Sequence, residues 1–176
     1  ATHWRKYVDM SERYAKDALT LGQKPMVFIP FVSAYHNTGN MADKIAEGIK
    51  KVDNVHVEVH DVEKMPYEQM EYYLANCTGV IMGSPTINQN ILMPIYQLFA
   101  AVNPILDKGK LAGAFGSYGW SGEAAKMLES NFANLKLNYF GENLFVKFTP
   151  HEESMQQCVD YGENFARKMM AEIETE

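Results

Sequence analysis

The chain has 176 residues, of which 47% are hydrophobic and 22% are charged, enough apolar material for one domain with a substantial core. Its net charge of −6 and pI near 5.4 argue against nucleic acid or an anionic membrane as the main partner, because both would repel the average surface. Two distant cysteines and the lack of an apolar stretch of about 20 residues predict free thiols and a soluble, cytoplasmic protein.

The amino-terminal segment differs from the rest of the chain. At helical spacing, residues 2–19 place one apolar stripe on a single face, formed by Trp4, Tyr7, Val8, Tyr14 and Ala18. A GQKP break follows, so we expect an added helix or interdomain linker over 1–24, ahead of a domain at 25–176. The chain begins with Ala1 rather than methionine, which fits either processing or a piece of a longer protein.

Beyond this segment, short apolar runs alternate with amphipathic stretches, the rhythm of an α/β protein. The apolar runs predict five strands: MVFIPF (26–31), VHVEVHD (55–61), GVIMGS (79–84), LAGAFGS (111–117) and LFVKFT (144–149). The amphipathic stretches predict five helices: Thr38–Lys50, Tyr67–Ala75, Pro94–Val102, Ser121–Phe132 and Glu152–Ile173. The last helix has the clearest start signal, a Thr149 cap followed by Pro150 and by Glu152, which can reach back to the cap.

Alternating strands and helices imply a parallel sheet with right-handed crossovers, and five strands fit the doubly wound order 2-1-3-4-5. The second strand alternates valines with His56, Glu58 and His60, as expected of a strand with one wetter face at the sheet edge. Residues four apart in a strand lie roughly 13 Å apart, too far for His56 and His60 to hold one metal ion unaided. We therefore interpret these side chains as a solvated face and predict no metal site.

The stretch SAYHNTGN, residues 33–40, follows the first predicted strand, where doubly wound sheets bind ligands. A phosphate could be held there by free N–H groups of the next helix, the hydroxyls of Ser33 and Thr38 and the amide of Asn37. The helix dipole would favour its charge without a cationic side chain. The loop lacks the lysine of GxxxxGK[ST] and the glycines of GxGxxG, so a phosphomonoester fits better than a triphosphate or dinucleotide. Taken alone, the loop is interpreted equally well as an ordinary helix cap.

Two further polar loops follow the third and fourth predicted strands, GSPTINQN at 83–90 and GSYGWSG at 116–122. The carboxyl ends of parallel strands lie at one edge of a sheet, so we expect all three loops to converge. The last loop carries Tyr118 and Trp120 between glycines that would let a planar ring approach, although Trp120 could instead anchor the next helix. A phosphate loop beside an aromatic loop suggests flavin mononucleotide (FMN).

The segments SAYHNTGNMADKIAEGI, GVIMGSPTINQNILMPI and LAGAFGSYGWSGEAAKMLE resemble the flavodoxin-like domain of flavodiiron proteins, which are reductases of oxygen and nitric oxide. The resemblance covers most of residues 26–170 and implies a flavodoxin-like fold with bound FMN. It implies a phosphate site formed by Ser33, Tyr35, His36, Asn37 and Thr38. It also implies that the isoalloxazine ring and ribityl chain are surrounded by Pro85, Thr86, Ile87 and Asn88, and by Ser117, Tyr118, Gly119, Trp120 and Gly122.

By that resemblance, complete members of the family consist of a diiron domain followed by the flavodoxin-like domain. The diiron domain carries the ligand motif H-x-E-x-D-H. The most similar stretch of this chain is HVEVHD, in which the histidine and the aspartate are exchanged. The resemblance thus implies an electron-transfer module that relays electrons from rubredoxin or a flavin reductase to a diiron centre in the neighbouring subunit of a homodimer. No catalytic acid, base or nucleophile is evident, so enzymatic activity of the chain alone stays open.

Two other classes of function are considered. Flavodoxin-fold NAD(P)H:quinone oxidoreductases share the sheet, the FMN site and an S/T-P-T loop, and would oxidise NAD(P)H directly. A flavin-free receiver-like module needs clustered aspartates after the first strand. This chain has Pro30, Phe31, Val32 and Ser33 there, which argues against that class.

Overall fold

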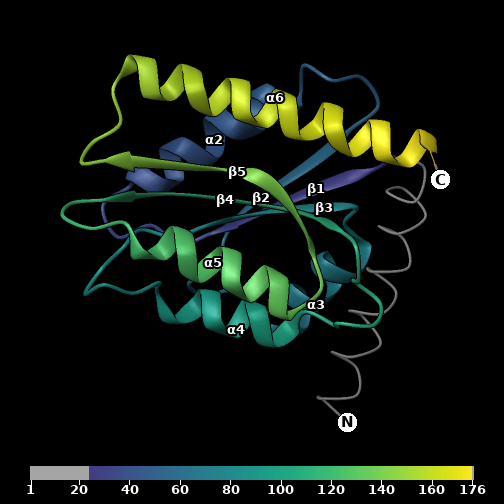
Figure 1. Ribbon diagram of the computed structural model, residues 1–176, viewed down its shortest axis with the longest axis horizontal. Coiled ribbons are helices and arrows are strands. Elements are labelled where there is room, and N and C mark those ends of the chain that lie inside the picture. Colours follow the sequence, from purple (N-terminus) through teal and green to yellow (C-terminus); the bar gives the residue numbers. More distant parts are fainter. Residues whose placement is uncertain (1–23, 176) are drawn as a thin grey trace, which may run out of the picture.

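A computed structural model of the protein describes residues 24–175, which form a five-stranded sheet between two layers of helices (Figure 1). The strands are β1 (Met26–Phe31), β2 (His56–Asp61), β3 (Gly79–Gly83), β4 (Leu111–Tyr118) and β5 (Asn138–Lys147). The helices are α2 (Asn37–Ile49), α3 (Tyr67–Asn76), α4 (Met93–Ala101), α5 (Glu123–Asn134) and α6 (Glu152–Thr175). The helix expected at 2–19 lies outside the described residues, so it and the linker stay predictions.

The strands pair in parallel in the order β2-β1-β3-β4-β5, which confirms the predicted doubly wound topology. Every residue of β3 is buried, as are all but the last residues of β1 and β4, as expected of strands covered on both faces. The continuous apolar runs of β1, β3 and β4, and the regular alternation of valines in β2, are the reason that the first four predicted strands match the structure to within one residue. None of the helices in 24–175 is long and apolar enough to cross a membrane.

Two hydrophobic cores cover the two faces of the sheet. Helices α2 and α6 lie on one face, where Ile29 of β1 shares a core with Ile45 and Phe165 (Figure 1). Helices α3, α4 and α5 lie on the other face, where Phe28 of β1 shares a core with Leu74. Because successive side chains of a strand point to opposite faces, β1 supplies both cores.

Helices α2 and α6 approach each other closely because each has a glycine at the contact. A Cβ atom on Gly48 would lie 1.9 Å from the carbonyl oxygen of Val159. One on Gly162 would lie 2.0 Å from the carbonyl oxygen of Ile45. Backbone therefore packs against backbone at this crossing, and the two glycines set the separation of the helices.

The fifth strand differs from the prediction. The apolar pattern predicts it at 144–149, whereas β5 begins six residues earlier and ends two residues earlier. Ala112 pairs with Tyr139 but Ala114 pairs with Asn143, so β5 carries two more residues than β4 in this stretch. Such a bulge disrupts the strict alternation of side chains. The first half of the strand therefore has no regular apolar pattern that would predict it.

The hydroxyl of Tyr161, on α6, replaces hydrogen bonds that the ladder loses at this bulge. It accepts a hydrogen bond from the Ala114 N–H at 3.1 Å and donates one to the Glu142 carbonyl at 3.2 Å. Burial raises the pKa of Tyr161 far above its ordinary value, so the hydroxyl remains a donor. Gly113 leaves the space for it, since a Cβ atom there would lie 2.5 Å from the hydroxyl oxygen.

We expect Tyr161→Phe to lower the free energy of unfolding by about 1–3 kcal/mol, because it leaves a buried N–H and a carbonyl without their partner. Urea unfolding of the apoprotein would measure this change. Tyr67→Phe is the matched control, because the Tyr67 hydroxyl donates to the Ala100 carbonyl at an exposed position where water can replace it. Equal losses in the two variants would contradict the role assigned to Tyr161.

Helix α6 begins at Glu152 as predicted, but the prediction of Thr149 as its cap is wrong. The Met155 N–H donates to the His151 carbonyl at 2.9 Å, so His151 accepts the first helical hydrogen bond. The chain bends at Phe148, whose φ is 61°, and Thr149 belongs to that bend. The capping pattern detects spacing only and does not reveal this preceding turn.

The edge strand β2 carries a cluster of three polar side chains on one face. His56 and His60 lie on either side of Glu58, with Nε2–Oε distances of 2.7 and 2.9 Å. The face is half-buried rather than solvated as expected, because the ring of Tyr73 on α3 lies 4.6 Å from that of His60. Within residues 24–175, no group of three or more His, Cys, Asp or Glu side chains is arranged to hold a metal ion.

The cluster of His56, Glu58 and His60 makes the free energy of unfolding depend on pH. Burial alone would raise the pKa of Glu58, but the hydrogen bonds and positive field of the two histidines outweigh it and hold the pKa below 4.5. A carboxyl whose pKa is lowered by folding stabilises the fold above its ordinary pKa, and this stabilisation is lost as pH falls through the folded value. We expect Glu58→Gln to cost about 1 kcal/mol at neutral pH. The difference from wild type should shrink as the pH falls below 4.5 and vanish once the pH is below the lowered pKa of Glu58.

Urea unfolding between neutral and acidic pH would test this expectation. Glu71→Gln, at an exposed position of α3, is the control and should change the free energy of unfolding little at any pH. A Glu58→Gln penalty that stays constant down to acidic pH would contradict the proposed origin.

Candidate functional site

Three loops meet at the carboxyl edge of the sheet. They follow β1, β3 and β4, which are adjacent in the sheet. Backbone hydrogen bonds join them beyond the strands: Val32 N–H to the Gly83 carbonyl at 3.0 Å, and Thr86 N–H to the Ser117 carbonyl at 2.9 Å. The predicted convergence of the three polar loops is therefore confirmed.

The first loop leads directly into α2. His36 is the N-cap residue with a φ of 62°, and the first turn of the helix contains no acidic residue. The Ser33 hydroxyl accepts a hydrogen bond from the Gly39 N–H at 3.2 Å, which leaves its proton free to be donated. The N–H groups of Asn37 and Thr38 have no intrahelical acceptor because they lie in the first turn. This loop therefore offers donors and a favourable helix dipole to an anion.

Thr38 provides the most direct sign of a missing ligand. Thr38 is only 1% exposed, yet its hydroxyl has no hydrogen-bond partner among the described residues. A buried hydroxyl without a partner costs free energy in the free protein, so such groups are rare unless a ligand satisfies them. Its position in the first turn of α2 fits a phosphate oxygen as that partner.

The second loop contains a tight turn at Asn88 and Gln89. Both residues have positive φ, 52° and 59°, and Ile87 and Asn90 exchange backbone hydrogen bonds at 3.0 Å in both directions. Positive φ at both central residues is typical of a type I′ turn. The Tyr96 hydroxyl donates to Asn90 Oδ1 at 2.7 Å and fixes the base of the turn. The loop therefore presents a defined backbone at the edge of the site.

The third loop presents aromatic surface. Trp120 is 94% exposed, and Tyr35 of the first loop is 80% exposed. A Cβ atom on Gly119 would contact nothing within 4 Å, so the backbone is open there. Two flat side chains on separate loops, both without apolar cover, fit a planar ring ligand. Trp120 is no packing anchor for α5, because a packing anchor would be buried.

The predicted site residues all lie on these three loops, but they do not contribute equally. Pro85 and Ser117 are buried, so only their backbone and edges can face a ligand. The Thr86 hydroxyl accepts a 3.4 Å hydrogen bond from the Ala124 N–H, which ties the second loop to α5. Ile87, Tyr118 and Gly122 are partly exposed at the same edge. Which of these residues touch a ligand stays a prediction.

Sequence reasoning overlooked two residues that shape this site. The Ser84 hydroxyl accepts from the Leu92 N–H at 3.2 Å and donates to the Pro85 carbonyl at 2.9 Å, closing the second loop from inside. The Phe148 N–H, just after β5, donates to the Tyr118 carbonyl at 2.7 Å. The segment that follows β5 therefore holds the third loop in place. Neither pairing has a sequence signal, because each joins segments through the fold.

The residues present fit FMN. The first loop provides uncharged donors and a buried free hydroxyl for a phosphate, and the other two provide a defined turn and exposed aromatic surface for a ring. The sequence of residues 29–162 matches the profile of the family described as Flavodoxin. The chain belongs to the flavodoxin family. Flavodoxin domains bind FMN, which confirms the predicted cofactor class.

This flavodoxin chain is also similar to longer proteins. It is 34% identical to the flavo-diiron protein FprA2 of Clostridium acetobutylicum over 94% of its own length and 40% of that protein's. Rubredoxin oxygen:oxidoreductase from Desulfovibrio gigas superposes with a TM-score of 0.78 and 28% identity, over 92% of this chain and 39% of that one. An archaeal flavodoxin superposes with a TM-score of 0.71 and 27% identity, over 82% of this chain and 99% of the flavodoxin. The chain thus spans about two fifths of its flavodiiron relatives.

Proposed function

We propose that this chain is the FMN-binding electron-transfer domain of a flavodiiron oxygen or nitric oxide reductase. The buried Thr38 hydroxyl at the start of α2 carries the proposal, because it has no hydrogen-bond partner within residues 24–175 and a phosphate oxygen would supply one. The similarity to flavodiiron proteins over 94% of the chain supports the parent class. Bound FMN would supply one- and two-electron chemistry, which amino-acid side chains lack.

The chain's own residues would bind and orient the cofactor. Ser33, His36, Asn37 and Thr38 would hold the phosphate. Tyr35, which the resemblance places with them, would instead contact the ring together with Trp120, because both side chains are exposed. The turn at 88–89 would lie against the ring edge with its rigid backbone. The net charge of −6 would lower the reduction potential, because a negative surface disfavours added electrons.

The partners follow from the same proposal. Electrons would arrive from rubredoxin or a flavin reductase and pass to a diiron centre in the neighbouring subunit of a cytoplasmic homodimer. The name of the Desulfovibrio gigas relative supports rubredoxin as the donor. Oxygen and nitric oxide are the two candidate terminal acceptors of the parent protein.

The test begins with the purified chain, whose bound chromophore is released by heat and identified by mass. We expect FMN, and we expect reduced rubredoxin to reduce the bound flavin in stopped-flow experiments. Steady-state oxidation of NADH with benzoquinone distinguishes the alternative, because a quinone oxidoreductase would turn over and an electron-transfer domain would not. A colourless chain that takes up no added FMN would overturn the proposal.

A further inference from the structure

Phe148 has a backbone conformation that a bulky side chain rarely adopts. Its φ of 61° lies in the left-handed region, where the Cβ atom crowds the following carbonyl oxygen. Among the non-glycine residues of 24–175 it is the one apolar residue with a positive φ; the others are His36, Asn54, Asn88, Gln89 and Lys136. Such strain persists only where the surrounding structure enforces it, and it is typical of functional sites.

The side chain of Phe148 does not compensate for this strain. It is 60% exposed, so it gains little from burial in a core. The Lys147 ammonium lies 5.3 Å from the centroid of the ring, but a cation–π contact at the surface stabilises little. Backbone and solvent therefore both disfavour phenylalanine here, and the conformation must be imposed by the path of the backbone.

The connection between β5 and α6 imposes that path. Lys147, the last residue of β5, pairs with Tyr118 at the end of β4. Only residues 148–151 join this pair to α6, which begins at Glu152 and packs into the core with Ile45 of α2. Pro150 confines the residue before it to extended conformations, which leaves the turn to Phe148.

This turn is bonded to the third loop. The Phe148 N–H donates to the Tyr118 carbonyl at 2.7 Å, one residue beyond the last pair of β4 and β5. Tyr118 also forms a parallel bridge with Thr86, whose N–H donates to the Ser117 carbonyl at 2.9 Å. Phe148 therefore binds the residue at which the second and third loops are joined, two positions before Trp120.

We propose that Phe148 is a positioning residue of the FMN site, whose left-handed backbone fixes Tyr118 and with it the third loop. Because β5 and α6 are both anchored, a residue that disfavours positive φ must shift the peptide between 147 and 148, which carries the N–H bound to Tyr118. The third loop would then lose its fixed position, while the first loop would keep its own. This role depends on the proposed function, in which the ring lies against the second and third loops.

Fluorescence titration of the apoprotein with FMN and with riboflavin tests this role. We expect Phe148→Val to weaken both flavins by the same factor, at least about tenfold, because a β-branched side chain disfavours positive φ and both ligands contain the ring. Phe148→Gly removes the aromatic ring but favours the left-handed conformation, so both affinities should stay within about threefold of wild type. Amide exchange at Thr86 should accelerate at least about tenfold in Phe148→Val and stay as in wild type in Phe148→Gly.

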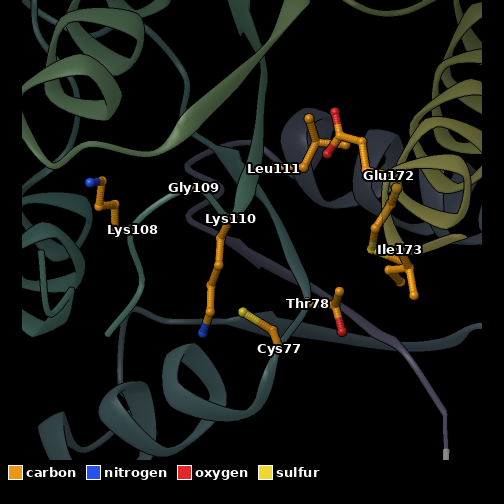
Figure 2. A pocket seen from close by; sticks show the side chains of 9 residues that line it. Cys77, Thr78, Lys108, Gly109, Lys110, Leu111, Glu172 and Ile173 are labelled. Carbon is orange, nitrogen blue, oxygen red and sulfur yellow. The ribbon is translucent and has the colours of Figure 1, made fainter. Parts of the chain in front are cut away.

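Lys136→Val is the matched control. Lys136 has a φ of 60° at the opposite edge of the sheet, where its carbonyl accepts from the Gly109 N–H at 2.9 Å. Figure 2 shows Gly109 in the wall of a cavity of about 340 Å³ at that edge. The control introduces the same backbone strain as Phe148→Val, but it should leave both flavin affinities and the exchange at Thr86 unchanged.

Wild-type affinity for both flavins in Phe148→Val would overturn this role alone. Equal losses in Phe148→Val and Phe148→Gly would also overturn it, because the aromatic side chain would then be the part that contacts the ring. If Phe148→Val does not fold, Phe148→Gly decides: relief of strain should slow amide exchange at residue 148 by about threefold with flavin affinity retained, and unchanged exchange would contradict the role. A wild-type chain that binds neither flavin would overturn the proposed function as well.

Discussion

Gly162→Ala is expected to lower the free energy of unfolding by roughly 1–3 kcal/mol. Alanine is intrinsically better than glycine inside a helix by about 1 kcal/mol, so propensity alone predicts the opposite sign. The new Cβ atom would lie 2.0 Å from the Ile45 carbonyl oxygen, however, and backbone cannot swing aside as a flexible side chain can. Helices α2 and α6 must therefore separate, and the core between them loses contacts.

Urea unfolding of the apoprotein measures this effect, and Gly119→Ala is the matched control. A Cβ atom on Gly119 meets nothing within 4 Å, so the control should change stability by less than about 0.5 kcal/mol. Gly48→Ala removes the other glycine of the crossing and should behave like Gly162→Ala. A stabilised Gly162→Ala variant would show that the helices can part freely.

Thr38→Val is expected to weaken FMN binding by roughly 10- to 100-fold, the equivalent of one hydrogen bond to a charged group. The valine has almost the same shape, so the apoprotein should keep its fold. It should even gain up to about 1 kcal/mol of stability, because the substitution removes a buried hydroxyl that has no partner among the residues that the structure describes. The two effects have opposite signs, which separates a ligand-binding role from a structural one.

Fluorescence titration of the apoprotein with FMN and with riboflavin checks this prediction. Riboflavin lacks the phosphate, so its affinity should be the same in wild type and Thr38→Val. Thr38→Ser keeps the hydroxyl and should restore most of the FMN affinity. Equal losses for both flavins would place Thr38 away from the phosphate, and a destabilised apoprotein would mean that its hydroxyl has a structural partner.

The fold could be predicted largely from the sequence because the central strands are buried on both faces. A strand such as GVIMG has no polar alternation to obscure it, and turn residues close it. The half-exposed β5 was predicted only in part, because its bulge breaks the alternation. The cap of α6 was misplaced for a similar reason, since the bend at Phe148 depends on where β5 ends.

The sequence by itself determined the order of elements, the polar loops after β1, β3 and β4, and the class of ligand that they could hold. These are local properties, because apolar runs, turn residues and loop chemistry are set by neighbours along the chain. Only the tertiary structure decided that the Thr38 hydroxyl is buried without a partner in the described part of the chain, and that Trp120 stays exposed. Only the tertiary structure decided that Tyr161 closes the bulge between β4 and β5. Burial and hydrogen-bond satisfaction depend on segments that are distant in sequence, and no local pattern records them.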